Sequence, residues 1–294
     1  DTAFLDDHVH LSLRGQARAA RAMAAAMSSL TGHLHVAAAL LETLPDDDTL
    51  AQKLGANMYD EYRVHHTLRV LFSVPFMRRA NPAAYAHHDA ACGAAEARMS
   101  PGVRAAARAW QTMQPHAGGL RPLTGMAARA LLREQRIAEA LRLYQIASRQ
   151  VPQYTSWYLE YVYFALACRE MLAGALSDEE HATAARAIEQ GRFLLAHGYA
   201  DTGFTQRYLG RLHQLRGEWA EAIPFLTAAR AQLRAEDLVA CDQALVLSYR
   251  KTRQYDAARA LVEQGLRAGG PYAQVYEKLR AEIARDASQP AGAR

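Results

Sequence analysis

Apolar residues recur at three- and four-residue spacing along most of this 294-residue chain, and runs that alternate strictly between apolar and polar positions are scarce. The positions between them are rich in Ala, Leu, Arg, Glu and Gln, which are residues that favour helices. Proline-containing stretches such as "LPDDD" at 44–48 and "QPHAGGLRP" at 114–122 interrupt the pattern. The sequence therefore predicts an all-α protein in which many helices are separated by short turns.

These interruptions also divide the chain into sections. We expect a short motif followed by a helix at 1–30, with the helix itself at 16–28. A helical connector follows at 31–117, and a helical array occupies 118–286. The residues at 287–294 have the composition of a flexible tail.

The array contains an internal repeat. The stretch "LGRLHQLRGEWAEAIPFLTAA" at 209–229 matches "LVLSYRKTRQYDAARALVEQG" at 245–265, which places Ala222 and Ala258 at equivalent positions 36 residues apart. An earlier copy lies at 127–152, where Ala140 and Ala147 take the small-residue positions. Because large and small residues alternate across the paired segments, two helices can approach each other closely.

This pattern resembles the tetratricopeptide repeat, whose period is about 34 residues. The residues that match it are Leu209, Gly210, Gly217, Trp219, Ala222, Leu226 and Ala229. Arg253 departs from it by replacing the turn glycine, and Pro224 departs from it by lying inside a second helix. The resemblance implies antiparallel hairpins stacked as a short α-solenoid. The concave face of such a solenoid binds a protein or peptide, although a purely intramolecular scaffold is an equal alternative.

A cluster of Asp and His, "DDHVHLSLRG", lies at 6–15, immediately before an Ala-rich helix. Asp7 and His10 stand three residues apart, so the carboxylate could orient the imidazole and make His10 a general base. Two other interpretations stay open. Asp6, Asp7, His8 and His10 could bind a metal ion, or the acidic residues could simply favour the N-terminus of the following helix.

The pattern D-x-x-H-L-x-x-x-G, followed by "QARAARAMAAAM", resembles the last conserved block of the SGNH (GDSL-like) hydrolases. The resemblance implies that Asp7 and His10 belong to a Ser-His-Asp triad and that 1–30 is the last loop and helix of a truncated α/β/α domain. The stretch "LAQKLGANMYDEYRVHHTLRVLFSVPF" at 50–76 resembles the connector of bacterial proteins that join such a domain to tetratricopeptide repeats. The implied substrate is an ester, such as an acylated carbohydrate, and the implied location is outside the cytoplasm.

The serine, glycine and asparagine blocks of that family do not occur in the sequence between Asp1 and Arg294. These blocks supply the nucleophile and the oxyanion-hole donors, which together provide most of the acceleration of acyl transfer. We therefore expect this chain to be the C-terminal part of a longer esterase and to be inactive as it stands. The competing hypothesis is a non-enzymatic scaffold for protein–protein interaction.

Composition narrows the remaining classes of function. The formal net charge is +4, but the arginines are scattered among Glu and Asp, so we expect no nucleic-acid partner. No apolar run is long enough to span a membrane. Cys92, Cys168 and Cys241 are widely spaced in apolar surroundings, which predicts small buried hydrophobic residues. The sequence indicates no cofactor.

Two further groups of residues have alternative interpretations. The paired histidines are expected to be solvated or capping residues rather than metal ligands; they are His33 and His35, His65 and His66, and His87 and His88. An aromatic set at helical spacing could line a groove, but core packing is favoured for it; this set is Trp157, Tyr158, Tyr161, Tyr163 and Phe164.

Overall fold

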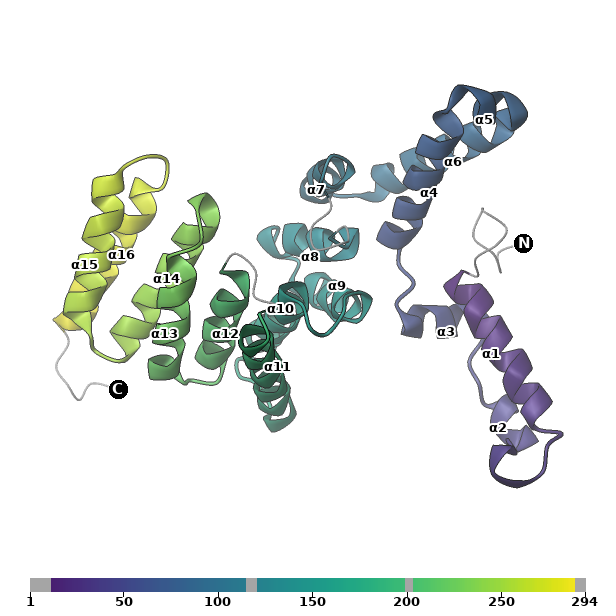
Figure 1. Ribbon diagram of the computed structural model, residues 1–294, viewed down its shortest axis with the longest axis horizontal. Helices are drawn as coiled ribbons and strands as arrows, with labels where there is room; N and C mark the ends of the chain where they lie inside the picture. Colours follow the sequence, from purple (N-terminus) through teal and green to yellow (C-terminus); the bar gives the residue numbers. More distant parts are fainter. Residues whose placement is uncertain (1–11, 115–120, 199–202, 289–294) are drawn as a thin grey trace. The chain divides into compact units, whose positions relative to one another are not determined.

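The computed structural model describes residues 12–114, 121–198 and 203–288. These residues form helices joined by turns and short connections, with no β-strand among them (Figure 1). The prediction of an all-α chain is therefore confirmed for the described residues. The chain divides into two compact units, 1–130 and 131–294.

The first unit contains short and long helices. In chain order they are α1 (Leu13–Met27), the 3-10 helix η1 (Gly32–Leu34), α2 (Ala38–Glu42), α3 (Asp47–Leu54), α4 (Met58–Ser73), α5 (Pro75–Ala80), α6 (Pro82–Arg98), α7 (Pro101–Gln111) and most of α8 (Leu123–Arg133). Helix α1 begins three residues earlier than the sequence predicts. The reason is that the Ser12 side chain caps the helix by accepting a hydrogen bond from the Gly15 amide at 3.0 Å.

Helix α1 packs against α3, and charged side chains join the two. Arg18 and Arg21 each lie 3.2 Å from a carboxylate oxygen of Asp47, at the first residue of α3. The pKa of the Asp47 carboxyl lies below its ordinary value, chiefly because Arg18 hydrogen-bonds to it. Met23 on α1 remains 68% exposed. Ion pairs therefore contribute to the contact between α1 and the connector, and Met23 stays outside that contact.

A buried tyrosine ties α4, α6 and α7 together. Tyr62 is fully buried and donates a hydrogen bond from its hydroxyl to Glu96 at 2.7 Å. The side-chain amide of Gln111 donates to the same hydroxyl at 2.5 Å. Because a buried hydroxyl without partners would be costly, these bonds favour one arrangement of the three helices.

The structure corrects the prediction that the paired histidines are solvated. His88 is only 2% exposed and stacks on Phe72, with ring centroids 5.6 Å apart. His66 is half-buried against Trp110. His88 is covered because α4 packs along α6, and His66 is covered by Trp110 of α7. The local sequence pattern reveals neither contact. The expectation of exposure is confirmed for three others, His33, His35 and His87.

The second unit is a stack of helices. It contains the end of α8, α9 (Ile137–Gln150), α10 (Ser156–Ala173), α11 (Asp178–Ala196), α12 (Phe204–Leu215), α13 (Trp219–Arg230), α14 (Ala235–Lys251), α15 (Tyr255–Ala268) and α16 (Ala273–Ala287). From α9 onward each helix packs against the next one along the chain. In addition α10, α12, α14 and α16 pack against one another in that order, which is the arrangement of a solenoid (Figure 1).

Three of the described turns in this unit share one geometry. Between α12 and α13, Gly217 has a φ of +75°, its amide bonds to the Gln214 carbonyl, and the next amide bonds to the His213 carbonyl, both at 2.9 Å. This is the hydrogen-bond pattern of a Schellman motif. The same pair of bonds closes the turn before α9 at Gln135 and the turn before α15 at Arg253.

Small residues let the paired helices approach, as the sequence predicts. A Cβ atom on Gly210 of α12 would lie 2.5 Å from Cγ of Leu226 and 3.2 Å from the carbonyl oxygen of Ala222, both on α13. Ala222 and Leu226 are fully buried, and so are Ala140 and Ala147 at the small-residue positions of α9. The alternation of large and small side chains is therefore a packing feature of the array.

All three cysteines are buried with free thiols, which confirms the prediction made for them. Burial raises the pKa of the Cys168 thiol to about 11 and that of Cys241 to about 12. Burial also raises the pKa of Cys92. Thiols of this kind stay protonated near neutral pH and are poor nucleophiles.

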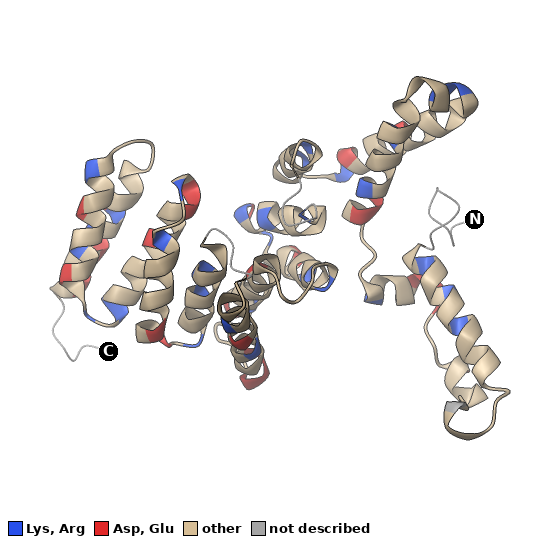
Figure 2. Ribbon diagram, viewed as in Figure 1, with Lys and Arg blue, Asp and Glu red and all other residues tan. Residues whose placement is uncertain are grey.

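Basic and acidic residues are scattered over the helices of both units and do not gather into one block (Figure 2). No helix among the described residues is long and apolar enough to cross a membrane.

Candidate functional site

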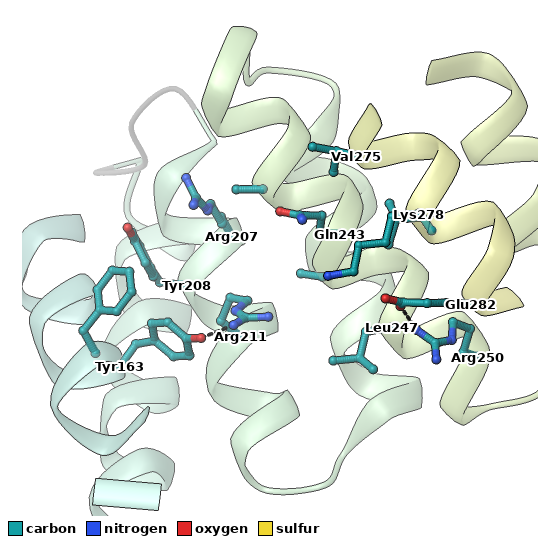
Figure 3. Close-up of a pocket in the computed structure, with 14 residues that line it drawn as sticks. Tyr163, Arg207, Tyr208, Arg211, Gln243, Leu247, Arg250, Val275, Lys278 and Glu282 are labelled. Carbon is teal, nitrogen blue, oxygen red and sulfur yellow. Dashed lines mark hydrogen bonds and ion pairs between the residues drawn. The ribbon is translucent and has the colours of Figure 1, made fainter. Parts of the chain in front are cut away.

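A groove of about 420 Å³ opens on the face of the second unit that α10, α12, α14 and α16 form (Figure 3). Its lining is Tyr163 and Phe164 from α10, Arg207, Tyr208 and Arg211 from α12, Ala240, Gln243, Ala244, Leu247 and Arg250 from α14, and Val275, Lys278, Leu279 and Glu282 from α16. A pocket of this volume is in the range that holds a small ligand or a few side chains of a peptide.

The repeat explains why these side chains face one space. Side chains four residues apart on a helix project from the same face, as Arg207 and Arg211 do on α12. The repeat of 36 residues places Gln243 and Leu247 at the equivalent positions of α14. Because α12 and α14 pack side by side, the two pairs line neighbouring parts of the groove.

Aromatic rings form one end of the groove. The ring centroid of Tyr163 lies 5.0 Å from that of Phe164 and 5.9 Å from that of Tyr208. Tyr161 and Tyr163 are buried, as expected for core residues, yet Tyr163 and Phe164 also line the groove. Some members of the aromatic set thus pack in the core and others line the groove, which are the two roles that the sequence leaves open.

Two of the cations in the groove are neutralised by carboxylates. Arg207 lies 2.6 Å from Asp237 of α14. Arg250 makes an ion pair with Glu282 and a second one, at 2.9 Å, with Asp286 of α16. These pairs link neighbouring helices and contribute little net charge to the groove.

Arg211 and Lys278 supply the remaining positive charge. Arg211 donates hydrogen bonds to the Tyr163 hydroxyl and, at 2.9 Å, to the side-chain oxygen of Gln214, and its guanidinium lies 4.9 Å from the centroid of the Tyr163 ring. These partners are neutral, so they orient the guanidinium without cancelling its charge. Lys278 is exposed and points into the pocket (Figure 3).

A second layer of hydrogen bonds fixes the walls of the groove. The Gln214 side-chain amide on α12 donates to the Ala244 carbonyl at 2.6 Å and to the Ser248 hydroxyl at 2.7 Å, both on α14. The Tyr276 hydroxyl on α16 donates to Asp242 of α14 at 2.8 Å. Because all these groups are buried, loss of one partner would leave an unsatisfied polar atom.

The groove has the chemistry of a binding site. Its polar lining groups are guanidinium, ammonium, amide, phenol and carboxylate, and none of its lining residues is a Ser, Cys or His. The aromatic end offers flat apolar surface, and the cations offer hydrogen-bond donors and positive charge. Such a lining favours an elongated ligand that has carboxylates beside apolar groups.

The residues that the sequence proposes as catalytic, Asp7 and His10, lie outside the described residues, and so do Asp6 and His8. The sequence pattern does not indicate Arg211 or Lys278 as candidate binding residues. The repeat does contain a signal for Arg211, because this residue lies on the first helix of its hairpin, at a position that faces the next hairpin. A single repeat, however, does not show which face of the array stays open to solvent.

Comparisons of the chain with protein-family models, with curated proteins and with solved structures find no significant match.

Proposed function

We propose that the helical array binds an extended acidic peptide, or an acidic segment of a partner protein, along the groove between α10 and α16. The observation that carries this proposal is the pair of cations, Arg211 and Lys278, at the lining of a groove with an aromatic end. Arg207 and Arg250 are already paired with carboxylates of the chain itself. A carboxylate of the ligand would therefore pair with Arg211 and Lys278.

The proposed array is of the tetratricopeptide type. Its support is the repeated turn geometry at Gln135, Gly217 and Arg253 and the close packing of Gly210 against Leu226. In a stack of this kind the first helices of successive hairpins form one continuous surface, which suits a ligand that runs across several repeats.

Selection from a random-peptide display library tests the proposal. The full chain should enrich peptides that contain Asp or Glu next to an aromatic or aliphatic residue. Lys278→Glu should remove this enrichment, because it reverses an exposed charge in the groove without disturbing the core.

Arg267→Glu is the matched control. Arg267 is exposed on α15, a helix that does not contribute to the groove, and its reversal changes the net charge by the same amount. Equal loss of acidic peptides with both variants would show that the net charge of the chain, and not the groove, selects them, and would contradict the proposal.

The link to an SGNH-type ester hydrolase stays a proposal about a longer parent protein, with Asp7 as the orienting carboxylate and His10 as the base. Its support is the sequence pattern at 6–15, and hydrolysis of p-nitrophenyl acetate by a longer product of the locus, abolished by His10→Ala, would test it.

A further inference from the structure

Three histidine rings meet between α4 and α6 in the first unit, far along the chain from the groove. His65 comes from α4, and His87 and His88 are adjacent on α6. Each offers one ring nitrogen to a common space, and these nitrogens all lie within 4.8 Å of one another. The sequences around these histidines, H-H-x-x-R on α4 and H-H-D on α6, do not have the spacing of a known metal-binding motif. The ligand atoms come together only because the two helices pack against each other.

The distances between the rings suit one tetrahedral ion. The ring centroids are 5.8 Å apart for His65 and His87, 5.3 Å for His65 and His88, and 5.1 Å for His87 and His88. A tetrahedral ion with bonds of about 2.0–2.1 Å to nitrogen separates its donor nitrogens by about 3.3 Å and the ring centroids by about 5 Å. Nδ1 of His65 and Nδ1 of His88 are 3.0 Å apart, so small shifts of the side chains would complete the geometry.

The shared contact between His65 and His88 is itself informative. Two imidazole nitrogens at 3.0 Å can share one proton, with one ring donating and the other accepting. Two protonated rings facing each other in this way would repel. When both rings carry their proton on Nε2, the two Nδ1 lone pairs point toward one position, which a metal ion can occupy.

The surroundings hold the rings in place on one side and leave the other side open. His88 is 2% exposed and stacks on Phe72 at an interplanar angle of 13°, which restricts its ring. His87 is exposed, so an ion could enter from solvent. A ligand set that is fixed at one end and open at the other resembles the zinc sites with three protein ligands and a fourth water ligand.

Two further contacts hold α4 and α6 in register around the cluster. Tyr62, three residues before His65, bonds to Glu96 of α6 at 2.7 Å. Arg69, four residues after His65, lies 3.3 Å from Asp89, the residue next to His88. Asp89 offsets the charge of Arg69, which would otherwise oppose a bound cation. The three rings are thus held on a rigid pair of helices, which reduces the cost of assembling a site.

We propose that His65, His87 and His88 bind one Zn²⁺ ion, with solvent as the remaining ligand. Imidazole nitrogen suits zinc and its neighbours in the first transition row, whereas Mg²⁺ and Ca²⁺ prefer oxygen. The ion would bridge α4 and α6 and stabilise the first unit. The site is independent of the proposed peptide groove, since its residues lie in the other unit.

Isothermal titration of the full chain with ZnCl₂, after removal of metals by EDTA and dialysis, tests the proposal. We expect one equivalent to bind tightly and MgCl₂ to give no binding heat. Loading with Co²⁺ should give the visible absorption of a tetrahedral site. His87→Ala removes an exposed ligand and leaves the core intact, and it should weaken zinc binding by more than the roughly 10- to 100-fold that loss of an outer-sphere partner causes.

Two controls separate this site from other histidines. His33→Ala removes an exposed histidine of the same unit and should leave zinc binding unchanged. A double variant, His8→Ala with His10→Ala, removes the candidate ligands near the start of the chain and should also leave it unchanged. Zinc affinity that survives His87→Ala and His65→Asn, or that disappears in the double variant, would overturn the proposal, as would the absence of zinc binding by the unaltered chain.

Discussion

Arg253 has the same left-handed backbone conformation as Gly217, the residue 36 positions earlier, with φ of +59° against +75°. Both residues close a turn between two helices with the same pair of backbone hydrogen bonds. Glycine adopts this conformation at no steric cost, but a side chain such as arginine is strained in it by about 1–2 kcal/mol. The backbone is therefore strained at the turn that contains Arg253 and unstrained at the turn that contains Gly217.

Arg253→Gly should accordingly stabilise the array. Relief of the strain exceeds the greater entropy of glycine in the unfolded chain, and we expect a net gain of up to about 1 kcal/mol. The urea midpoint of the full chain, followed by circular dichroism, measures it. Gly217→Ala is the matched reverse substitution and should lower the midpoint. A lower midpoint for Arg253→Gly would contradict this interpretation of the turn.

Gly210→Ala should destabilise the array. The new Cβ would lie 2.5 Å from Leu226 Cγ and would meet the Ala222 carbonyl, so α12 and α13 must separate at a cost of about 1–3 kcal/mol. Thermal unfolding measures this cost.

Gly93→Ala provides the comparison for this effect. Gly93 lies inside α6, and its added Cβ would meet no atom within 4 Å. Because alanine favours a helix more than glycine does, this variant should gain about 0.5–1 kcal/mol. Equal effects of the two substitutions would show that close packing at Gly210 does not matter.

Asp242 gives the array a pH dependence of defined sign. Burial raises the pKa of this carboxyl above its ordinary value near 3.8, although hydrogen bonds from Tyr276 and Arg230 act in the opposite direction. Between the unfolded and the folded pKa, the folded state holds a proton that the unfolded state has lost. The contribution of Asp242 to stability is therefore present at low pH and decreases as the pH rises through the folded pKa.

Asp242→Asn removes this titration while retaining a side chain of similar shape. The free energy of unfolding of the unaltered chain, minus that of Asp242→Asn, should decrease as the pH rises from about 4 to neutrality. Urea unfolding at several pH values measures the difference. An increase with pH would instead show that the ion pair with Arg230, at 2.6 Å, outweighs burial.

The array was predictable because its determinants are local. The apolar spacing, the small residues at Ala222 and Ala258 and the position of the turn at Gly217 all lie within one repeat. Pro224 departs from the repeat pattern because proline disfavours the interior of a helix, yet α13 continues through it. The start of α1 was displaced because a single capping bond from Ser12 decides it.

The candidate sites depend on contacts between distant segments, which is why the sequence did not reveal them. His65 and His88 meet only because α4 packs on α6, and the same packing buries His88. Arg207 and Arg211 are neighbours on one helix, but only the first is neutralised, since Asp237 reaches it from α14. The way the helices pair, and not the residue type, therefore decides whether a side chain can bind a metal ion, carries a charge that no carboxylate neutralises, or is an ordinary surface residue.

Recognition of negative charge by Lys278 in the groove is tested most directly by a charge-swap binding measurement. Fluorescence anisotropy would give the affinity of the full chain and of Lys278→Glu for an acidic peptide obtained by display and for the same peptide with its acidic residue changed to Lys. We predict that Lys278→Glu weakens binding of the acidic peptide by about tenfold, or about 1.4 kcal/mol, and that the Lys peptide restores affinity to this variant. Equal affinities of the two chains for both peptides would contradict the account.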